Sequence, residues 1–321
     1  MINKKKVLFY GNCQLAVLSK MLQLQNPKFN EEYDVLKASD YNLAPIYETS
    51  IGTVAPFMYR EHTEYGVATP ETIKAVEQIT EDADIIIFQQ LHQAKHIDRP
   101  EEFTTDYIYQ KHKANKRMIC VPSFWFSGYL TNITKDNLVI PYILKWLLDK
   151  GLSNEQILYW LKNESHHNIS LLIDNQVQHS IKEIKNREIE ESFKYKDFVS
   201  ILDILSEYKK IFLCYNMAHP SEYYFKKLYY KLIEIIDNNI QNEILEKNIT
   251  VPRSPFFTYP LDFHWFKENY PNISNCDPKH YVNHLDKKFI DEQVYLIKKL
   301  DIESDSFKRE IQENINILNC I

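Results

Sequence analysis

Residues 6–22, KVLFYGNCQLAVLSKML, contain the stretch that decides the fold. The apolar run from Lys6 to Tyr10 is typical of a short strand, and it ends at a Gly-Asn turn. Leu15, Leu18 and Leu22 then recur at helical spacing. The stretch therefore predicts a strand, a turn and a helix, with Cys13 at the start of the helix.

The same alternation continues along the first 121 residues. Further strands are expected at Tyr33–Ala38, Ala83–Phe88 and Arg117–Val121, and the Ile-Ile-Ile core of the second of these is typical of a strand buried on both faces. Thr69-Pro70 is a helix-start pattern for a helix at Glu71–Ile79, and another helix is expected at Phe103–Ala114. Strands alternating with helices predict an α/β protein with a mostly parallel central sheet.

Extra helices are expected in the middle of the chain and at its C-terminal end. Ser153 to Gln156 forms a capping-box pattern, and a strand is expected at Ile211–Tyr215. The other expected helices cover 140–148, 168–187, 198–208, a long stretch from Pro220, 286–300 and 304–318. We expect a single α/β domain over residues 1–321, with the proline- and aromatic-rich segment 248–321 packing on it.

Composition excludes several classes of function. The chain has 38 basic and 44 acidic residues, so a nucleic-acid-binding surface is not its main feature. No apolar stretch approaches the roughly 20 residues of a membrane span, and the run after the basic N-terminus stops at Gly11, which indicates a cytoplasmic protein. The pairs His92/His96 and His280/His284 lack the glutamate of HExxH, so no metal site is expected.

The cysteines are odd in number and widely spaced, without a CxxC pair, so we expect free thiols rather than disulfides or a zinc site. Cys13 differs from the others because it follows a strand and begins a helix. Helix N-termini favour the thiolate, which makes Cys13 a candidate nucleophile. The Gly11 and Asn12 amides and Gln14 could hold an oxyanion. The alternative is that Cys13 is a small buried residue at a tight turn.

A cysteine nucleophile needs a base, and His219 is the best placed by sequence. It follows the expected strand Ile211–Tyr215, and in an open parallel sheet the loops after the strands converge on one crevice. This predicts that His219 lies at the same edge of the sheet as Cys13. The alternative is that His219 merely caps the helix after it.

Several segments together resemble the WcbI-like polysaccharide biosynthesis proteins of bacterial capsule pathways. The most specific are Gly11-Asn12-Cys13-Gln14 and Asn216-Met217-Ala218-His219-Pro220, and their order and separation fit the family. The others are Gln89-Gln90-Leu91, Val121-Pro122-Ser123, Phe126-Ser127-Gly128-Tyr129 and Tyr195-Lys196-Asp197-Phe198, so the resemblance spans about the first 240 residues. The chain departs from the family at Leu130-Thr131, where a proline is expected, and by one extra residue before His219-Pro220.

The resemblance implies a three-layer fold similar to SGNH hydrolases, with coenzyme A or acetyl-CoA as ligand. It implies acetyl transfer to a sugar in capsular or other surface polysaccharide biosynthesis, with Cys13 and His219 as catalytic residues and with glycosyltransferase machinery as a partner. The expected cofactor-binding residues are Gln89, Gln90, Ser123, Phe126, Gly128, Tyr129 and Asn216.

Two other hypotheses stay open at this point. The same groups could pass the acyl group to water, which would make the protein an esterase or thioesterase. The chain could instead be a coenzyme A- or glycan-binding accessory protein without catalysis. The aromatic residues Phe124 to Phe126 could cover an acyl or sugar group, or could equally be ordinary core.

Overall fold

The structure is a computed structural model, and it describes residues 4–11, 13–37, 70–90, 101–126, 141–163, 167–216, 219–237 and 287–303. The chain divides into two compact units. The first contains Met1–Ser123, Asn186–Ile204 and Glu222–Ser254, and the second contains Phe124–Lys185, Leu205–Ser221 and Pro255–Ile321. The single domain expected from the sequence stays a prediction.

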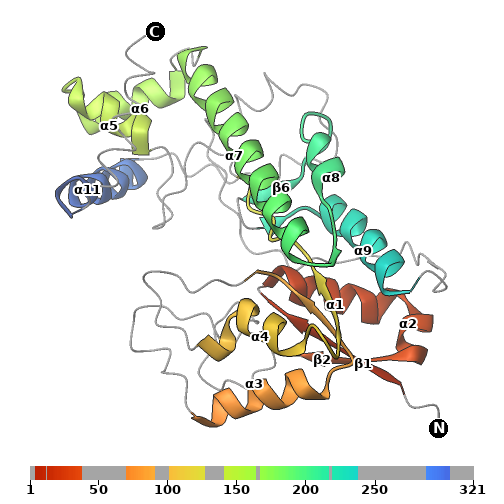
Figure 1. Cartoon of the computed structure of the whole chain (residues 1–321). Coiled ribbons are helices and arrows are strands. Elements are labelled where there is room, and N and C mark those ends of the chain that lie inside the picture. Colours follow the sequence, from red (N-terminus) through yellow and green to blue (C-terminus); the bar gives the residue numbers. More distant parts are fainter. Residues whose placement is uncertain are drawn as a thin grey trace. The chain divides into compact units, whose positions relative to one another are not determined.

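The first unit is built on a five-stranded sheet (Figure 1). Its strands are β1 (Lys5–Tyr10), β2 (Tyr33–Lys37), β3 (Ile85–Phe88), β4 (Arg117–Cys120) and β5 (Asp197–Phe198). Their order is β2-β1-β3-β4-β5, and every neighbouring pair is parallel. All four residues of β3 are buried, as its apolar sequence predicts for a central strand covered on both faces.

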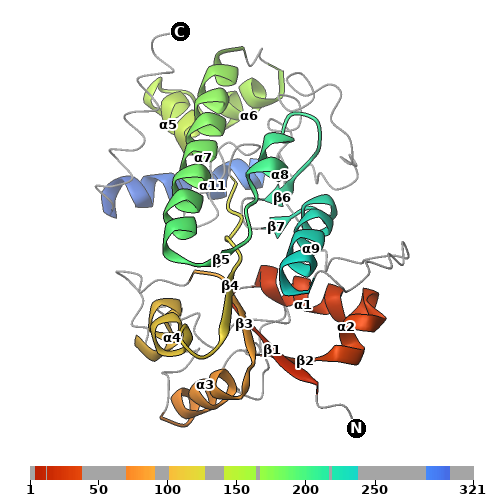
Figure 2. The ribbon, with the colours of Figure 1, turned by 45° about the vertical axis from the view of Figure 1, so that its right-hand side comes forward.

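Helices cover both faces of this sheet (Figures 1 and 2). On one side lie α3 (Pro70–Asp82) and α4 (Thr105–His112); on the other lie α1 (Cys13–Gln25), α2 (Pro27–Glu32) and α9 (Glu222–Ile236). Leu8, Ile86 and Met118 of the strands pack with Val76 of α3 and Ile108 of α4 in one buried cluster. Side chains of a strand alternate between its two faces, so the intervening residues face the other helix layer. The expected three-layer α/β architecture is confirmed.

The sequence-based expectations differ from the structure at the short helix α2 and at the helix expected over 198–208. The short helix α2 was not expected; it begins at Pro27 after Asn26, whose side chain accepts a hydrogen bond from the Phe29 N–H at 2.9 Å. The helix expected at 198–208 is shorter, because Asp197–Phe198 pairs with β4 as strand β5 and α8 covers only Leu202–Ser206. Glu188 explains the later start, since its carboxylate accepts a hydrogen bond from the Ile201 N–H at 3.1 Å.

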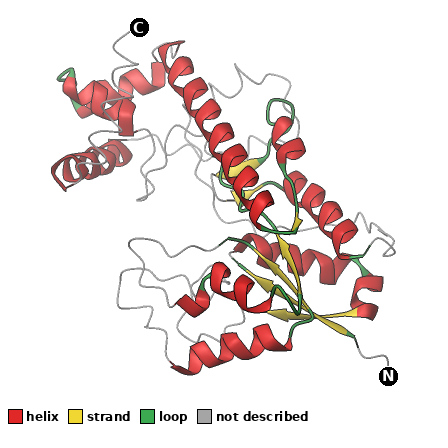
Figure 3. Ribbon diagram, viewed as in Figure 1, coloured by secondary structure: helices red, strands yellow, loops and turns green. Residues whose placement is uncertain are grey.

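The second unit is mostly helical in its described part (Figure 3). It contains α5 (Pro141–Asp149), α6 (Asn154–Asn163), α11 (Lys287–Glu303) and most of α7 (His167–Lys194), whose last residues belong to the first unit. The capping box is confirmed: the Ser153 N–H donates to Gln156 Oε1 at 2.8 Å, and the Gln156 N–H donates to Ser153 Oγ at 3.3 Å. The helix expected at 304–318 lies outside the described residues.

Ionic and polar contacts join α11 to α6. Lys287 pairs with Glu155 at 2.6 Å, and the Asn154 amide donates to Asp291 at 2.6 Å.

No helix in the described segments is long and apolar enough to cross a bilayer.

Candidate functional site

The turn between β1 and α1 forms the centre of the candidate site. Strand β1 ends at Tyr10, Gly11 follows, and α1 begins at Cys13. The backbone of Cys13 therefore stands at the N-terminus of a 13-residue helix, as the sequence predicts. Free N–H groups and the helix dipole at such an end stabilise a thiolate or an oxyanion. Asn12 lies outside the described residues.

The strand order gives this turn a special place in the sheet. From β1 the chain passes first to β2 on one side and later to β3 on the other, so the connections diverge between β1 and β3. In open parallel sheets, ligands bind beyond the carboxyl ends of the strands at such a switch point. Gly11 to Gln14 follow β1, and Gln89 and Gln90 follow β3, so the strand order places these two segments at the expected position.

Gly11 has no room for a side chain. A Cβ atom on it would lie 2.7 Å from Cδ1 of Leu15 and 3.1 Å from Cβ of Gln89. Both distances are tighter than ordinary van der Waals contact, so the glycine allows the β1–α1 turn to approach the end of β3 closely.

Gln89 is fully buried and contacts both neighbouring loops. Its amide Nε2 donates to Oε1 of Gln14 at 3.2 Å and lies 3.5 Å from the carbonyl oxygen of Pro122. Gln14 is also buried, with 3% of its surface exposed. These contacts bring together three segments that the sequence analysis had singled out separately.

The remaining expected ligand-binding residues differ in their surroundings. Gln90 and Ser123 are partly exposed. Phe126 is fully buried in the second unit, where its ring lies 6.0 Å from Phe124 and 6.1 Å from Tyr208. These ring contacts are typical of core packing, the alternative that the sequence left open. Gly128 and Tyr129 lie outside the described residues.

The surroundings of His219 differ from the sequence-based expectation. The strand before it, β6 (Cys214–Asn216), does not join the five-stranded sheet; it pairs antiparallel with β7 (His219–Pro220), with Asn216 opposite His219. The strand thus pairs with a segment that follows it closely in the chain. The expectation that a shared parallel sheet brings His219 to the edge of Cys13 was therefore wrong. The long helix begins at Glu222 rather than at Pro220.

Two other cysteines are poor nucleophiles. Cys120 and Cys214 are buried free thiols, and burial raises the pKa of each far above its usual value. Sγ of Cys214 donates to the Phe126 carbonyl oxygen at 3.5 Å. Cys276 and Cys320 lie outside the described residues.

Two buried carboxylates were missed by the sequence analysis. Glu188 and Glu191 of α7 are 3% and 5% exposed, and desolvation raises the pKa of both, that of Glu191 to about 7. A signal was present in the sequence, because both continue the helical stripe of Val177 and Ile184. Among the residues that the structure describes, no cluster of three or more histidine, cysteine or acidic residues could hold a metal ion.

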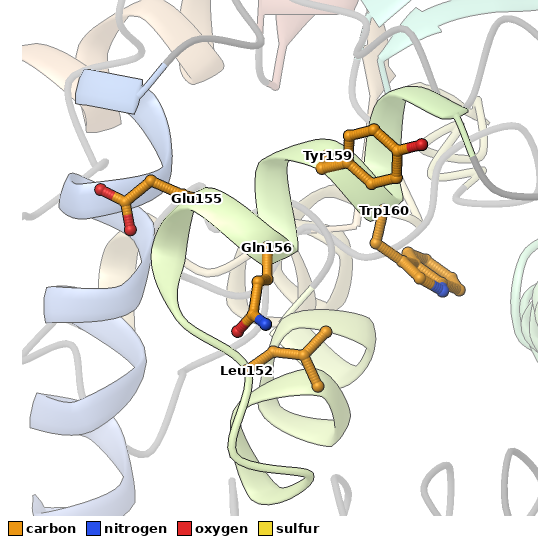
Figure 4. Close-up of a pocket in the computed structure, with 5 residues that line it drawn as sticks. All are labelled: Leu152, Glu155, Gln156, Tyr159 and Trp160. Atoms are coloured by element: carbon orange, nitrogen blue, oxygen red, sulfur yellow. The ribbon is translucent and has the colours of Figure 1, made fainter.

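A separate hollow of about 330 Å³ lies on α6 (Figure 4). Its lining residues are Leu152, Glu155, Gln156, Tyr159 and Trp160. None of them belongs to the site expected from the sequence.

The fold and the β1–α1 turn define the class of protein: a three-layer α/β protein with a parallel sheet in the order 2-1-3-4-5 and a cysteine at its switch point. The chain matches no protein-family model and no curated protein. Among solved structures it is similar to WcbI, described as a novel polysaccharide biosynthesis enzyme, with a TM-score of 0.64 and 16% identity over 98% of this chain and 99% of that one. The expected likeness to WcbI is therefore confirmed for the fold.

The WcbI structure is described as the native protein without a disulfide bond between coenzyme A and one of its cysteines. That statement concerns WcbI.

Proposed function

We propose that this chain is a coenzyme A-dependent enzyme of polysaccharide biosynthesis that transfers an acetyl group from acetyl-CoA to a sugar hydroxyl. The observation that carries the proposal is the position of Cys13, at the first residue of α1 and at the switch point of a fold that matches WcbI over 98% of its length. The WcbI structure is described in terms of a disulfide bond that is absent between coenzyme A and one of its cysteines, and this description supports coenzyme A as the cofactor.

The described residues around Cys13 fit a thioester substrate. The N-terminus of α1 supplies backbone N–H groups where an oxyanion would form, and the buried amides of Gln14 and Gln89 lie beside it. Partly exposed Gln90 and Ser123 are available to the donor or the sugar. Coenzyme A would supply the activated acyl group when bound.

In this proposal the Cys13 thiolate attacks the carbonyl carbon of the thioester, and the carbon–sulfur bond to coenzyme A breaks. His219, which we assign as the base on the strength of the resemblance to the WcbI-like proteins alone, accepts the thiol proton and passes it to the departing sulfur. His219 then accepts the proton of the sugar hydroxyl, whose oxygen attacks the acyl group on Cys13, and the cysteine sulfur leaves. Acetylated sugar and free coenzyme A are the products, and no oxidant or reductant is needed.

The setting in the cell is part of the same proposal. We place the activity in the cytoplasm, on a precursor of capsular or other surface polysaccharide, beside the glycosyltransferases that build it. Asn216, Gly128 and Tyr129 are proposed to help bind the ligand, on the strength of the resemblance to the WcbI-like proteins alone.

Calorimetric titration of coenzyme A and acetyl-CoA into the protein tests the proposal. We expect wild type to bind both, and mass spectrometry to find an added acetyl group on the Cys13 peptide. Cys13→Ala should lose the adduct, whereas Cys320→Ala should retain it. Absence of binding to either ligand would remove the proposed function. An adduct that water discharges as fast as a sugar acceptor does would favour a thioesterase. Binding of coenzyme A without an adduct and without transfer to any sugar acceptor would favour an accessory role.

A further inference from the structure

Gln89 is placed to hold together the loops at the carboxyl ends of the three central strands. It is the first residue after β3, and its backbone N–H donates to the Tyr10 carbonyl oxygen at 3.1 Å. The Val121 N–H donates in turn to the Phe88 carbonyl oxygen at 2.8 Å. Backbone hydrogen bonds thus join β1, β3 and β4 up to the last residues before their loops. Gln89 lies at the point where these backbone hydrogen bonds end.

The amide group of Gln89 extends the connection to side chains. Its Nε2 donates to Oε1 of Gln14 at 3.2 Å and lies 3.5 Å from the carbonyl oxygen of Pro122. Gln14 directly follows Cys13 in the first turn of α1. One buried amide therefore links the turn that carries the cysteine to the segment after β4.

The other end of the amide lies against Gly11. Oε1 of Gln89 is 3.2 Å from the position that a Cβ atom on Gly11 would take, and it has no hydrogen-bond partner among the described atoms. Buried amide oxygens are nearly always hydrogen-bonded in folded proteins. The buried amide oxygen of Gln89 therefore lies against Gly11 without a partner among the described atoms.

We propose that Gln89 is a positioning residue for Cys13: it fixes the first turn of α1 so that the helix N-terminus acts on the thiol, without touching the acyl donor. Full burial of Gln89 supports a role through Gln14 rather than direct contact with a ligand. The inference deepens the proposed function, because that function gives Cys13 its chemical role.

Two substitutions separate the parts of this role. Gln89→Met keeps the length of the side chain and removes both hydrogen-bonding atoms. Gln89→Glu keeps the shape and replaces the Nε2 donor with a carboxyl oxygen. It adds a negative charge beside the first turn of α1 only above the pKa of the new carboxyl group, which burial raises. A negative charge at that place disfavours the thiolate and raises the pKa of a nearby thiol.

The test is the pH profile of Cys13 alkylation by iodoacetamide, measured on the full chain without ligand by peptide mass spectrometry. We expect both variants to shift the profile to higher pH, and a shift of one unit slows alkylation below the pKa of the thiol about tenfold. Gln14→Met removes the same hydrogen bond from the other side and should reproduce the shift of Gln89→Met. The matched control is Gln25→Met, a buried glutamine at the far end of the same helix, which should leave the profile unchanged.

A folded Gln89→Met or Gln14→Met protein with the wild-type profile would overturn the proposal. So would an unchanged profile combined with weaker coenzyme A binding, because that result assigns Gln89 to direct ligand contact. If wild type itself binds no coenzyme A, the proposed function fails, while the alkylation profile still decides the role of Gln89.

Discussion

Sγ of Cys120 donates a hydrogen bond to Oε2 of Glu191 across 3.9 Å, between the end of β4 and the last turns of α7. Both side chains are buried. The pKa of Glu191 is raised to about 7: desolvation is the main cause and nearby Glu188 adds to it, while Arg187, Cys120 and Lys194 act in the opposite direction. The folded protein therefore favours the protonated form of this carboxyl group near neutral pH.

This relationship predicts a pH-dependent stability. An unfolded glutamate has its usual pKa of 4.5, below that of folded Glu191. The folded state therefore binds the extra proton between these values, and its stability falls as pH rises from 4.5 to 7, by about 3 kcal/mol in all. Glu191→Gln, which cannot ionise, should lack this loss and be more stable than wild type at pH 8.

Urea unfolding of wild type and Glu191→Gln at pH 5 and pH 8 measures this difference. The matched control is Glu190→Gln, because Glu190 is an exposed residue on the same helix. The unfolding free energy of this variant should equal that of wild type at both pH values. Equal stability changes with pH in wild type and Glu191→Gln would contradict the role of Glu191.

A second prediction concerns Glu188, a residue of α7 whose carboxylate accepts a backbone hydrogen bond just before α8 begins. Its two carboxylate oxygens lie 3.1 and 3.3 Å from the Ile201 backbone nitrogen, just before α8 begins at Leu202. Glu188→Leu should leave this buried N–H without its acceptor and destabilise the protein by about 1–3 kcal/mol. Glu188→Gln keeps one acceptor oxygen and should cost less.

Hydrogen exchange at the Ile201 amide gives the local measurement. Exchange should accelerate in Glu188→Leu more than in Glu188→Gln, and more than at amides in β3. If the Ile201 amide is equally protected in both variants, the hydrogen bond contributes nothing to the start of α8.

The parts of the site that could be predicted are those that local sequence determines. The apolar run before Gly11 and the leucine spacing after it are sufficient to place Cys13 at the start of α1. The position of His219 could not be predicted in the same way. A short apolar strand has the same sequence pattern in a central parallel sheet and in a small antiparallel pair, and only tertiary pairing distinguishes β6 from a sixth strand of the sheet.

The contacts of the Gln89 amide could not be predicted from the sequence either. Its sequence position predicts only a polar residue after a buried strand. Its bond to Gln14, 75 residues away in the chain, depends on β1 and β3 being neighbours. The buried glutamates of α7 were missed because charged residues at inward positions are uncommon and look like the outer face of a helix.

A third prediction concerns Arg117, the first residue of β4. Its guanidinium donates to the carbonyl oxygens of Ile235 and Ile236 at the end of α9, and it pairs with Asp197 of β5 at 2.9 Å. Three acceptors in different directions suit a planar group with several donors better than an ammonium group. Arg117→Lys should therefore lose about 1 kcal/mol of stability, and Arg117→Met somewhat more.

Asp197→Asn is the matched control, because it removes only the partly exposed ion pair and should cost less than either change at Arg117. Chemical denaturation gives the comparison. A larger loss in Asp197→Asn than in Arg117→Met would show that the ion pair, rather than the end of α9, is the important contact.

The last prediction compares two glycines that are needed for different reasons. Gly11 has no positive φ but is crowded by Leu15 and Gln89, whereas Gly151 has a φ of 78° and nothing within 4 Å of its Cβ position. Gly11→Ala should destabilise the protein by about 1–3 kcal/mol through overpacking and should weaken both coenzyme A binding and Cys13 alkylation. Gly151→Ala should lower the stability of the protein by about 1 kcal/mol through backbone strain. It should change neither coenzyme A binding nor Cys13 alkylation.

Reducing the crowding provides the decisive comparison. The nearest atom to the added methyl group is Cδ1 of Leu15, so Leu15→Ala combined with Gly11→Ala should recover part of the lost Cys13 reactivity even though a buried leucine has been truncated. Unfolding curves and alkylation rates of the single and double variants form a complete cycle. If the two losses simply add in the double variant, the close approach of α1 to β3 is not what Gly11 provides, and its importance must come from the backbone of the turn.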